Sequence, residues 1–281
     1  MALGATDRAS GSLTSCEGRH STTNIWSVPP ASAASMPSAQ AVPRVEALSR
    51  SQRMVSGLAI ATAVALLAAC GYRLLAGVDV WQWWVPLVCV AGVATADFGS
   101  GLVHWAADTW GRDDLPVIGS RLLVPFRVHH VNPDDFVERR FLDTNGEVAA
   151  IALPVLCALL MIPIDGRWGA VSAVFGFAFC GVGIFTNQIH QWAHTPSPPR
   201  GVRMLQHCGV LLSRTAHTAH HDRPYDAHYC ITTGWCNRPL EAIGLFRRLE
   251  WVITRVTGAL PRQDDDLYAA RYGVQELRRD G

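Results

Sequence analysis

The chain has 281 residues, of which 49% are hydrophobic and only 17% charged, and its formal net charge is +1. Such a nearly neutral chain lacks the basic surface that nucleic-acid binding requires, so we expect no nucleic-acid partner. Its eight cysteines are scattered and show no paired C-x-x-C spacing, which argues against a thiolate metal site or a disulfide framework. The placement of the apolar residues therefore decides the class of protein.

Residues 1–50 are rich in Ala, Ser, Thr and Pro and lack apolar periodicity, which predicts a disordered N-terminal tail before a membrane domain over residues 51–281. Four apolar stretches follow, at about residues 55–75, 80–104, 148–164 and 168–189. Each approaches the roughly 20 residues that a helix needs to cross a bilayer. A soluble protein can bury one such helix, but four are hard to bury. We predict an all-α membrane protein with four transmembrane helices.

Arginine placement predicts the orientation of these helices. Arginines precede the first stretch, lie between the second and third, and follow the fourth, whereas the two short connections on the other side carry only Arg73 and Arg167. By the positive-inside rule, both termini and the middle connection are expected in the cytoplasm. We expect a multi-pass protein of a bacterial inner membrane.

Eight of the eleven histidines fall into the segments GLVHWAADTWG, FRVHH, NQIHQWAHT and HTAHH. A helix returns to the same face after three or four residues, so the H-x-x-x-H pair and the H-x-x-H-H triplet are each expected to aim at one point. The predicted orientation brings all four segments to the cytoplasmic face. Because a structural zinc ion needs about four ligands, eight histidines predict a di-metal site formed by helix ends and cytoplasmic segments. Its candidate ligands are His104, His129, His130, His190, His194, His217, His220 and His221.

Ligands of this kind favour iron, zinc or copper. A di-zinc hydrolase would usually need bridging carboxylates and an aqueous route for its substrate. A di-iron site can use dioxygen to remove hydrogen from an unactivated C–H bond, which suits a site beside lipid chains. We therefore favour two iron ions with dioxygen as co-substrate. The di-zinc hydrolase and a non-enzymatic metal-binding membrane regulator remain alternatives.

Three polar residues are spaced to accompany the histidines. Asp97 and Asp108 share a helical stripe with His104, and Asn187 shares one with the pair in NQIHQWAHT. Asp108 can ligate a metal or orient a ligating imidazole. A carboxylate as deep in a span as Asp97 is costly, so it serves either the site or a hydrogen bond between helices.

Arg127 and Arg214 flank histidine segments and can each bind a lipid phosphate or simply extend to the membrane surface. The run Asp264–Asp266 is interpreted as solvated charge. His207 and His228 stand outside the histidine segments and are not counted among the ligands.

Five segments together resemble the Kua family of membrane lipid desaturases: DFGSGLVHWAADTWG, PFRVHH-x-x-P, FLDTNG, FTNQIHQWAHT and HHDRPYDAHYCITTGWCNRPLE. The resemblance runs from about Asp97 to Asp265 and leaves out the N-terminal tail. It implies a desaturase of the plasmanylethanolamine type, which introduces the vinyl ether double bond into the 1-O-alkyl chain of an ether phospholipid to give a plasmalogen. The family's histidine motifs map onto the eight candidate ligands named above.

The resemblance also implies an external two-electron donor, either reduced cytochrome b5 or a ferredoxin-like carrier. A plant branch of the same family desaturates an acyl chain of phosphatidylglycerol, which is the nearest alternative activity. The metal motifs alone do not separate these two reactions.

Overall fold

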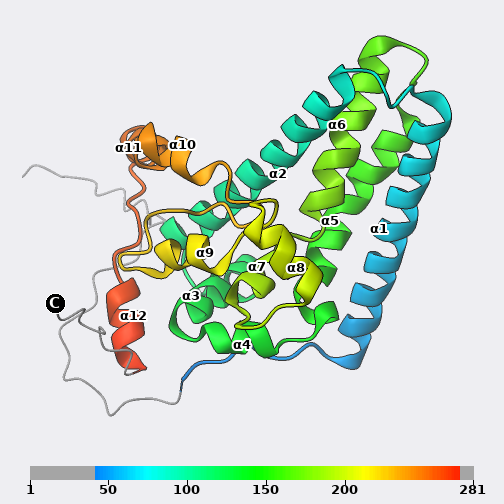
Figure 1. Ribbon diagram of the computed structural model, residues 1–281. Coiled ribbons are helices and arrows are strands. Elements are labelled where there is room, and N and C mark those ends of the chain that lie inside the picture. The colour runs from blue at the N-terminus through cyan, green and yellow to red at the C-terminus, as the bar shows by residue number, and fades with distance from the viewer. Residues whose placement is uncertain (1–41, 273–281) are drawn as a thin grey trace, which may run out of the picture.

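The computed structural model describes residues 42–272, and within that range every regular element is a helix (Figure 1). Four helical segments are long and apolar enough to cross a membrane. They are α1 (Arg50–Gly77), α2 (Trp84–Thr109), α5 (Phe141–Met161) and the nearly continuous pair α6 (Arg167–Gly183) and α7 (Thr186–His194). The predicted all-α membrane fold with four spanning helices is confirmed.

The third span begins at Phe141 rather than near residue 148. Its first turns are polar, so a hydropathy argument misses them; Asp143 accepts a hydrogen bond at 3.0 Å from Arg53 of α1. The fourth span also continues past its expected end, because the helix resumes after Phe185 and carries His190 and His194.

The shorter helices gather at one end of the four-helix bundle (Figure 1). The π-helical turn η1 and helices α3 and α4 connect α2 to α5, and five further helices follow α7. Their bounds are η1 (Gly119–Leu123), α3 (Val124–Val131), α4 (Pro133–Glu138), α8 (Arg200–His207), α9 (Arg214–His221), α10 (Asn237–Ala242), α11 (Leu245–Thr257) and α12 (Asp265–Arg271). The ends of α2 and α7 therefore meet helices from both connecting segments.

Residues 42–49 belong to the predicted tail, yet they contact α4. The side-chain amide of Asn132 donates to the carbonyl of Pro43 at 3.0 Å, and the backbone N–H of Val45 donates to Asp135 at 3.3 Å. The predicted disordered segment is thus too long at its C-terminal side. Its remaining residues, 1–41, lie outside the described residues.

Within the bundle, α1 packs mainly on α5, and α2 packs on α6. Small residues allow these helices to approach, as expected where lipid removes the hydrophobic drive for helix association. Gly92 of α2 is the clearest case, because an added Cβ would lie 2.6 Å from the carbonyl oxygen of Phe175 and 3.1 Å from the N–H nitrogen of Phe179. The contact is with backbone, which cannot rotate away.

We therefore expect Gly92→Ala to destabilise the bundle by about 1–3 kcal/mol, the usual cost of overpacking. The measurement is the thermal unfolding midpoint of the detergent-purified protein. Gly99→Ala on the same helix is the control, because an added Cβ there meets nothing within 4 Å. Equal midpoints for the two variants would contradict the close approach of α2 and α6.

Candidate metal centre

The structure brings all eight candidate histidines and Asp108 into two compact groups, within each of which the candidate ligand atoms lie no more than 4.8 Å apart. The five-histidine group takes one residue from α3, two from α7 and two from α9. The carboxylate group takes two residues from α2, one from α3 and one from α9. Their members are His129, His190, His194, His217 and His221 in the first, and His104, Asp108, His130 and His220 in the second.

Helix geometry decides which group a histidine joins. Residues four apart stay together, whereas the adjacent residues His129 and His130 enter different groups because successive side chains diverge by about 100°. The segment HTAHH is divided in the same way: His217 and His221 face one group and His220 faces the other. The prediction that this triplet aims at a single point is wrong.

In the five-histidine group, the Nε2 atoms crowd together. Nε2 of His217 lies 2.8 Å from that of His190, 2.8 Å from that of His194 and 3.2 Å from that of His221. Both ring nitrogens of His129 are buried and have no hydrogen-bond partner among the described residues. Lone pairs that converge in this way favour a cation, because neutral imidazoles cannot all donate to one another.

In the carboxylate group, backbone carbonyls determine the tautomers. Nδ1 of His104 lies 3.0 Å from the carbonyl oxygen of Tyr229, and Nδ1 of His220 lies 2.8 Å from that of Ala227. A carbonyl only accepts, so both Nδ1 atoms carry the proton and both Nε2 atoms present lone pairs. This is the arrangement that metal-bound histidines usually adopt.

Those lone pairs face Asp108, whose Oδ2 lies 3.3 Å from Nε2 of His104 and 3.5 Å from Nε2 of His220. Asp108 is 8% exposed, and neither of its carboxylate oxygens has a hydrogen-bond partner among the described residues. A buried carboxylate without a donor is costly unless a cation neutralises it. The donor set of three imidazoles and one carboxylate fits a metal ion.

Burial also keeps the imidazoles neutral. It lowers the pKa of His129, His130, His217 and His221 well below the ordinary value, and neighbouring imidazoles lower it further. Burial lowers the pKa of His220 to about 4, although its hydrogen bond to the carbonyl of Ala227 acts in the opposite direction. At neutral pH these side chains are in the deprotonated form that binds metals.

Asp97 lies in neither group. Its Oδ1 accepts hydrogen bonds from the backbone N–H groups of Thr232, Thr233 and Gly234 at 2.7–3.2 Å, and its Oδ2 accepts one from Cys236 at 3.0 Å. The structure therefore supports a structural role for Asp97, although its partner is the non-helical segment 232–236 and not another helix. It anchors the segment that follows Tyr229 to α2.

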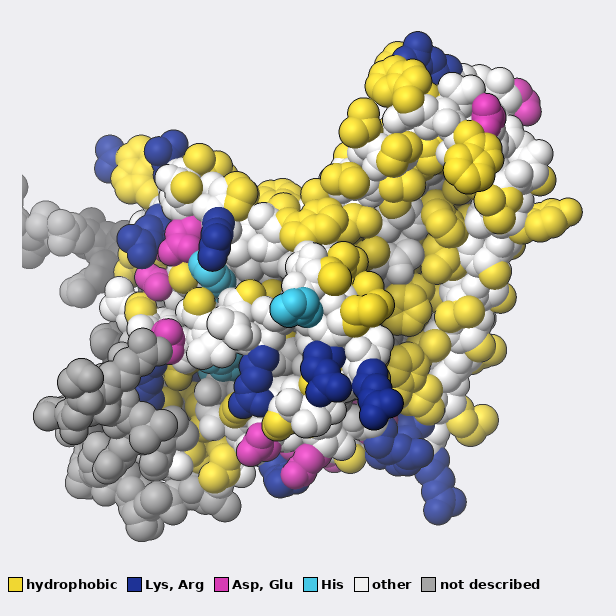
Figure 2. All heavy atoms as spheres, viewed as in Figure 1, with side chains coloured by type: hydrophobic (Ala, Val, Ile, Leu, Met, Phe, Trp, Pro, Cys, Tyr) yellow, Lys and Arg dark blue, Asp and Glu magenta, His cyan; other side chains and the backbone are white. Residues whose placement is uncertain are grey.

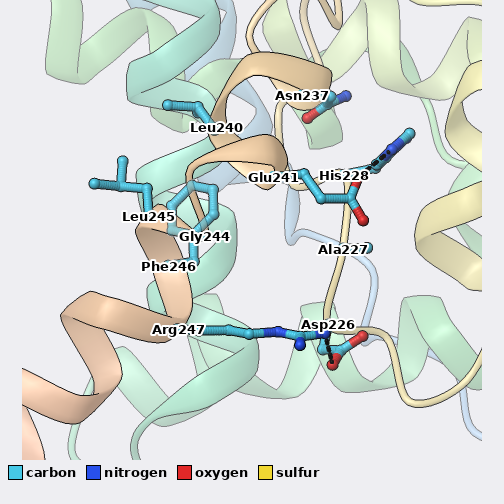
Figure 3. Close-up of a pocket in the computed structure, with 10 residues that line it drawn as sticks. All are labelled: Asp226, Ala227, His228, Asn237, Leu240, Glu241, Gly244, Leu245, Phe246 and Arg247. Carbon is cyan, nitrogen blue, oxygen red and sulfur yellow. Dashed lines mark hydrogen bonds and ion pairs between the residues drawn. The ribbon is translucent and has the colours of Figure 1, made fainter.

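The other predicted polar residues have different positions. Asn187 donates to the carbonyl of Thr144 at 2.6 Å and so joins α7 to α5 instead of turning to the metal ligands. Arg214 is exposed at the start of α9. His228 pairs with Glu241 at 2.8 Å (Figure 3), and His207 is exposed on α8, so neither joins a metal group.

Arg127 is buried, so neither predicted alternative, contact with a lipid phosphate or extension to the membrane surface, fits the structure. Its guanidinium lies 3.0 Å from carboxylate oxygens of Asp113 and Asp264 and 3.3 Å from one of Asp265. It also stacks 4.1 Å from the ring centre of Tyr268. Asp264 and Asp265 are therefore ion-pair partners, and interpreting them as solvated charge is wrong.

No sequence pattern singles out Arg262 as part of the site. Its buried guanidinium donates to the carbonyl oxygens of Asp108 at 2.6 Å and Ala107 at 3.2 Å, and it pairs with Asp265 at 3.0 Å. Asp265 also pairs with Arg127, two residues before His129. This ion-pair network joins the end of α2 to α3, the two helices that supply three of the four members of the carboxylate group.

Asp108→Asn tests the role of the carboxylate. We expect the wild-type protein to bind two metal ions and the variant to bind the ion of the carboxylate group about 10–100-fold more weakly. The measurement is metal content per chain after dialysis, together with activity. The alternative that Asp108 caps the helix end has no support in its contacts, because neither carboxylate oxygen has a donor among the described residues. Unchanged metal content and activity in the variant would show that the carboxylate is not a ligand.

Arg262→Gln tests the ion-pair network. Because breaking a buried ion pair typically costs about 3–5 kcal/mol, we expect a lower thermal midpoint. We also expect metal to be lost from the carboxylate group before the five-histidine group. Arg262→Lys should recover part of the thermal midpoint and part of the metal content of the carboxylate group, since lysine keeps the charge but not the planar set of donors. The exposed Arg271 supplies the control Arg271→Gln. Equal loss of both ions would mean that Arg262 serves only general stability.

Comparison of the sequence with known proteins identifies the family to which the chain belongs. The lipid desaturase domain family matches residues 93–264. The chain is 42% identical over 212 residues to a plasmanylethanolamine desaturase of Myxococcus xanthus, covering 74% of each chain. It is 43% identical over 196 residues to plasmanylethanolamine desaturase 1 of Mus musculus, covering 66% of this chain and 71% of the mouse protein.

The chain is also 34% identical over 201 residues to the chloroplastic fatty acid desaturase 4-like 1 of Arabidopsis thaliana, covering 70% of this chain and 66% of the plant protein. No solved structure is detectably similar. The family match covers more than half of the chain and includes both metal groups. The chain therefore belongs to the lipid desaturase domain family and is a multi-pass membrane oxidoreductase that acts on lipid.

Proposed function

We propose that this protein is a plasmanylethanolamine desaturase. It would introduce a double bond between the first two carbons of the 1-O-alkyl chain of an ether phospholipid and so form a plasmalogen. The observation that carries the proposal is the identity of 42% and 43% to two relatives of that name, one bacterial and one mammalian. Identity to the plant fatty acid desaturase is lower, at 34%.

The position of the candidate metal ligands supports a lipid substrate. His104 and Asp108 end one spanning helix, and His190 and His194 end another. The reacting carbon would therefore meet the ligands at a membrane surface, close to the headgroup. The first alkyl carbon of an ether lipid lies at that depth, whereas the middle of an acyl chain lies deeper in the bilayer.

The ether oxygen also makes the reaction easier. A C–H bond next to that oxygen is weakened, because an oxygen lone pair stabilises the developing radical. Loss of hydrogen from the first alkyl carbon and then from its neighbour leaves a double bond conjugated with the oxygen. The chain's own residues would hold the lipid in position, and the exposed Arg214, three residues before His217, is our candidate for binding its phosphate.

We propose iron as the metal in both groups and dioxygen as the co-substrate. Bound iron would supply the dioxygen chemistry that removes hydrogen from the alkyl chain, and ligation by imidazole nitrogen, with a carboxylate in one of the two groups, suits iron. Reduction of dioxygen to two water molecules takes four electrons. The lipid supplies two of them, so an external carrier must supply the other two. Reduced cytochrome b5 or a ferredoxin-like protein would serve.

An acyl-chain desaturase acting on phosphatidylglycerol or another membrane lipid is the alternative activity, and the 34% identity to the plant relative is the observation in its favour. A non-enzymatic metal-binding regulator is a more distant alternative. It predicts that membrane lipid composition does not depend on the metal ligands.

Lipid analysis separates these functions. We expect cells that express the protein to contain phospholipids whose alkenyl chain is released by mild acid, and cells that express His217→Ala or His220→Ala to lack them. These two variants remove one ligand from each metal group. The active protein should contain iron when its metals are measured after purification.

His207→Ala is the control and should leave the lipids unchanged, because His207 is exposed and joins neither group. A new acyl double bond without acid-labile chains would favour the acyl-chain alternative. Unchanged lipids in the presence of the wild-type protein would favour the regulator, and stoichiometric zinc in the active protein would overturn the iron proposal.

We also propose that the histidine-bearing end of the bundle faces the cytoplasm of a bacterial cell, with the protein in the inner membrane. Arginine placement supports this orientation. At the opposite end, Trp81, Trp83 and Trp168 are 71–90% exposed, as tryptophans at the outer membrane surface would be.

Cysteine labelling of intact cells tests the orientation. In a background whose exposed native cysteines are replaced by serine, a membrane-impermeant maleimide should label Gln82→Cys and Asp165→Cys but not Asp114→Cys. All three positions are exposed in the structure, so access depends on the side of the membrane. Labelling of Asp114→Cys from outside would refute the proposed orientation.

A further inference from the structure

Helix α11 has an inner face that packs on α2. The rings of Trp105 and Phe246 lie 5.4 Å apart, and the indole N–H of Trp105 donates to Glu250 at 2.8 Å. Glu250 is the only acidic residue of α11, and this hydrogen bond turns it toward α2. The remaining charged side chains of the helix are arginines.

The outer face of α11 is apolar and basic. Trp251 and Val256 are 68% and 78% exposed, and Val252 is 44% exposed. Arg248 and Arg255 lie on the same face, and no carboxylate whose side chain the structure describes is in ion-pair distance of either. Figure 2 shows basic and hydrophobic side chains next to one another over α10 and α11. In water this face would expose large apolar side chains and leave two charges unpaired.

Contacts of α10 and α11 with the segment that follows α9 determine the direction of this face. Figure 3 shows Glu241 of α10 facing His228, and Arg247 of α11 facing Asp226, with ion-pair distances of 2.8 and 3.3 Å. Arg247 therefore points toward the segment that follows α9 and is paired there. Arg248 and Arg255 are left for a partner outside the chain.

An apolar groove lies behind α11, between this helix, the end of α2 and residues 111–123. Its volume is about 390 Å³, and its lining includes Trp105, Ala106, Leu115, Ile118, Leu122 and Ile253. Helix α11 contributes Ile253 and Thr257 to the groove, and the end of the membrane-spanning helix α2 lies across from them. Hydrocarbon would fill such a groove. In water its apolar lining would stay exposed, at a cost in free energy.

We propose that the outer face of α11 lies in the headgroup layer of an anionic membrane leaflet. Trp251, Val252 and Val256 enter the boundary between headgroups and acyl chains, as the apolar faces of interfacial helices do. Arg248 and Arg255 reach anionic phosphate groups at the same depth. The chemistry of this face, arginine with tryptophan and no outward carboxylate, is that of a lipid surface.

This placement has a consequence for lipid access. Trp105, which holds α11, follows His104 directly in α2, so the leaflet would reach the end of the helix that supplies metal ligands. A lipid could then approach that end without leaving the membrane. The inference about α11 does not depend on which lipid the enzyme oxidises.

Photocrosslinking of the full-length protein in nanodiscs tests the proposal. Benzoylphenylalanine replaces Val256 in one variant and Asp134, an exposed residue of α4, in the control. In discs that contain phosphatidylglycerol, irradiation should add the mass of one phospholipid to the Val256 variant and not to the Asp134 variant. The yield should fall several-fold in phosphatidylcholine discs, and also when Arg248→Gln and Arg255→Gln are added.

Absence of a lipid adduct at position 256 would overturn the proposal. So would a protein adduct at that position in native membranes, which would identify the face as a protein-docking surface. A lipid adduct whose yield is the same in neutral and anionic discs would overturn the requirement for an anionic leaflet. Metal content, measured in parallel, reports whether a variant has kept its fold.

Discussion

The organisation of this protein depends on the electrostatics of a buried carboxylate surrounded by imidazole lone pairs. Asp108 has no hydrogen-bond donor for either oxygen among the described residues, and its nearest polar neighbours are Nε2 atoms of His104 and His220 at 3.3 and 3.5 Å. Such an arrangement is unfavourable without a cation, because buried charge and unpaired lone pairs both cost free energy. A metal ion bound there would therefore couple its binding to the packing of the helix ends that meet at Asp108.

Helix α2 connects this constraint to the rest of the fold. Asp97 binds the backbone N–H groups of residues 232–236, which anchors the segment just after Tyr229. The carbonyl of Tyr229 in turn orients His104. At the C-terminal end of the helix, Arg262 binds the carbonyl of Asp108. A spanning helix and two segments far from it in sequence thus hold one another in the positions that metal binding requires.

The same helix relates the candidate metal centre to the membrane. Its N-terminal part packs on α6, where Gly92 permits contact with the backbone of that helix. Its last turns carry candidate metal ligands on one face and Trp105 on another. Trp105 supports α11, whose outer face has the composition of a membrane-surface helix. The candidate metal ligands and the residue that supports α11 therefore lie on different faces of a single helix.

The sequence alone determined the four spans, the eight histidines and the association of Asp108 with His104, because hydropathy and helical spacing are local properties of the chain. Tertiary structure decided the rest. Helical geometry already turns His129 away from His130 and His220 away from His221, but which of these histidines share a candidate metal group depends on where the neighbouring helices lie. The anchoring role of Asp97, the burial of Arg127 and the contact between Arg262 and Asp108 join residues separated by more than 130 positions along the chain. No local pattern encodes such contacts, since each side chain finds its partner only after the helices have packed.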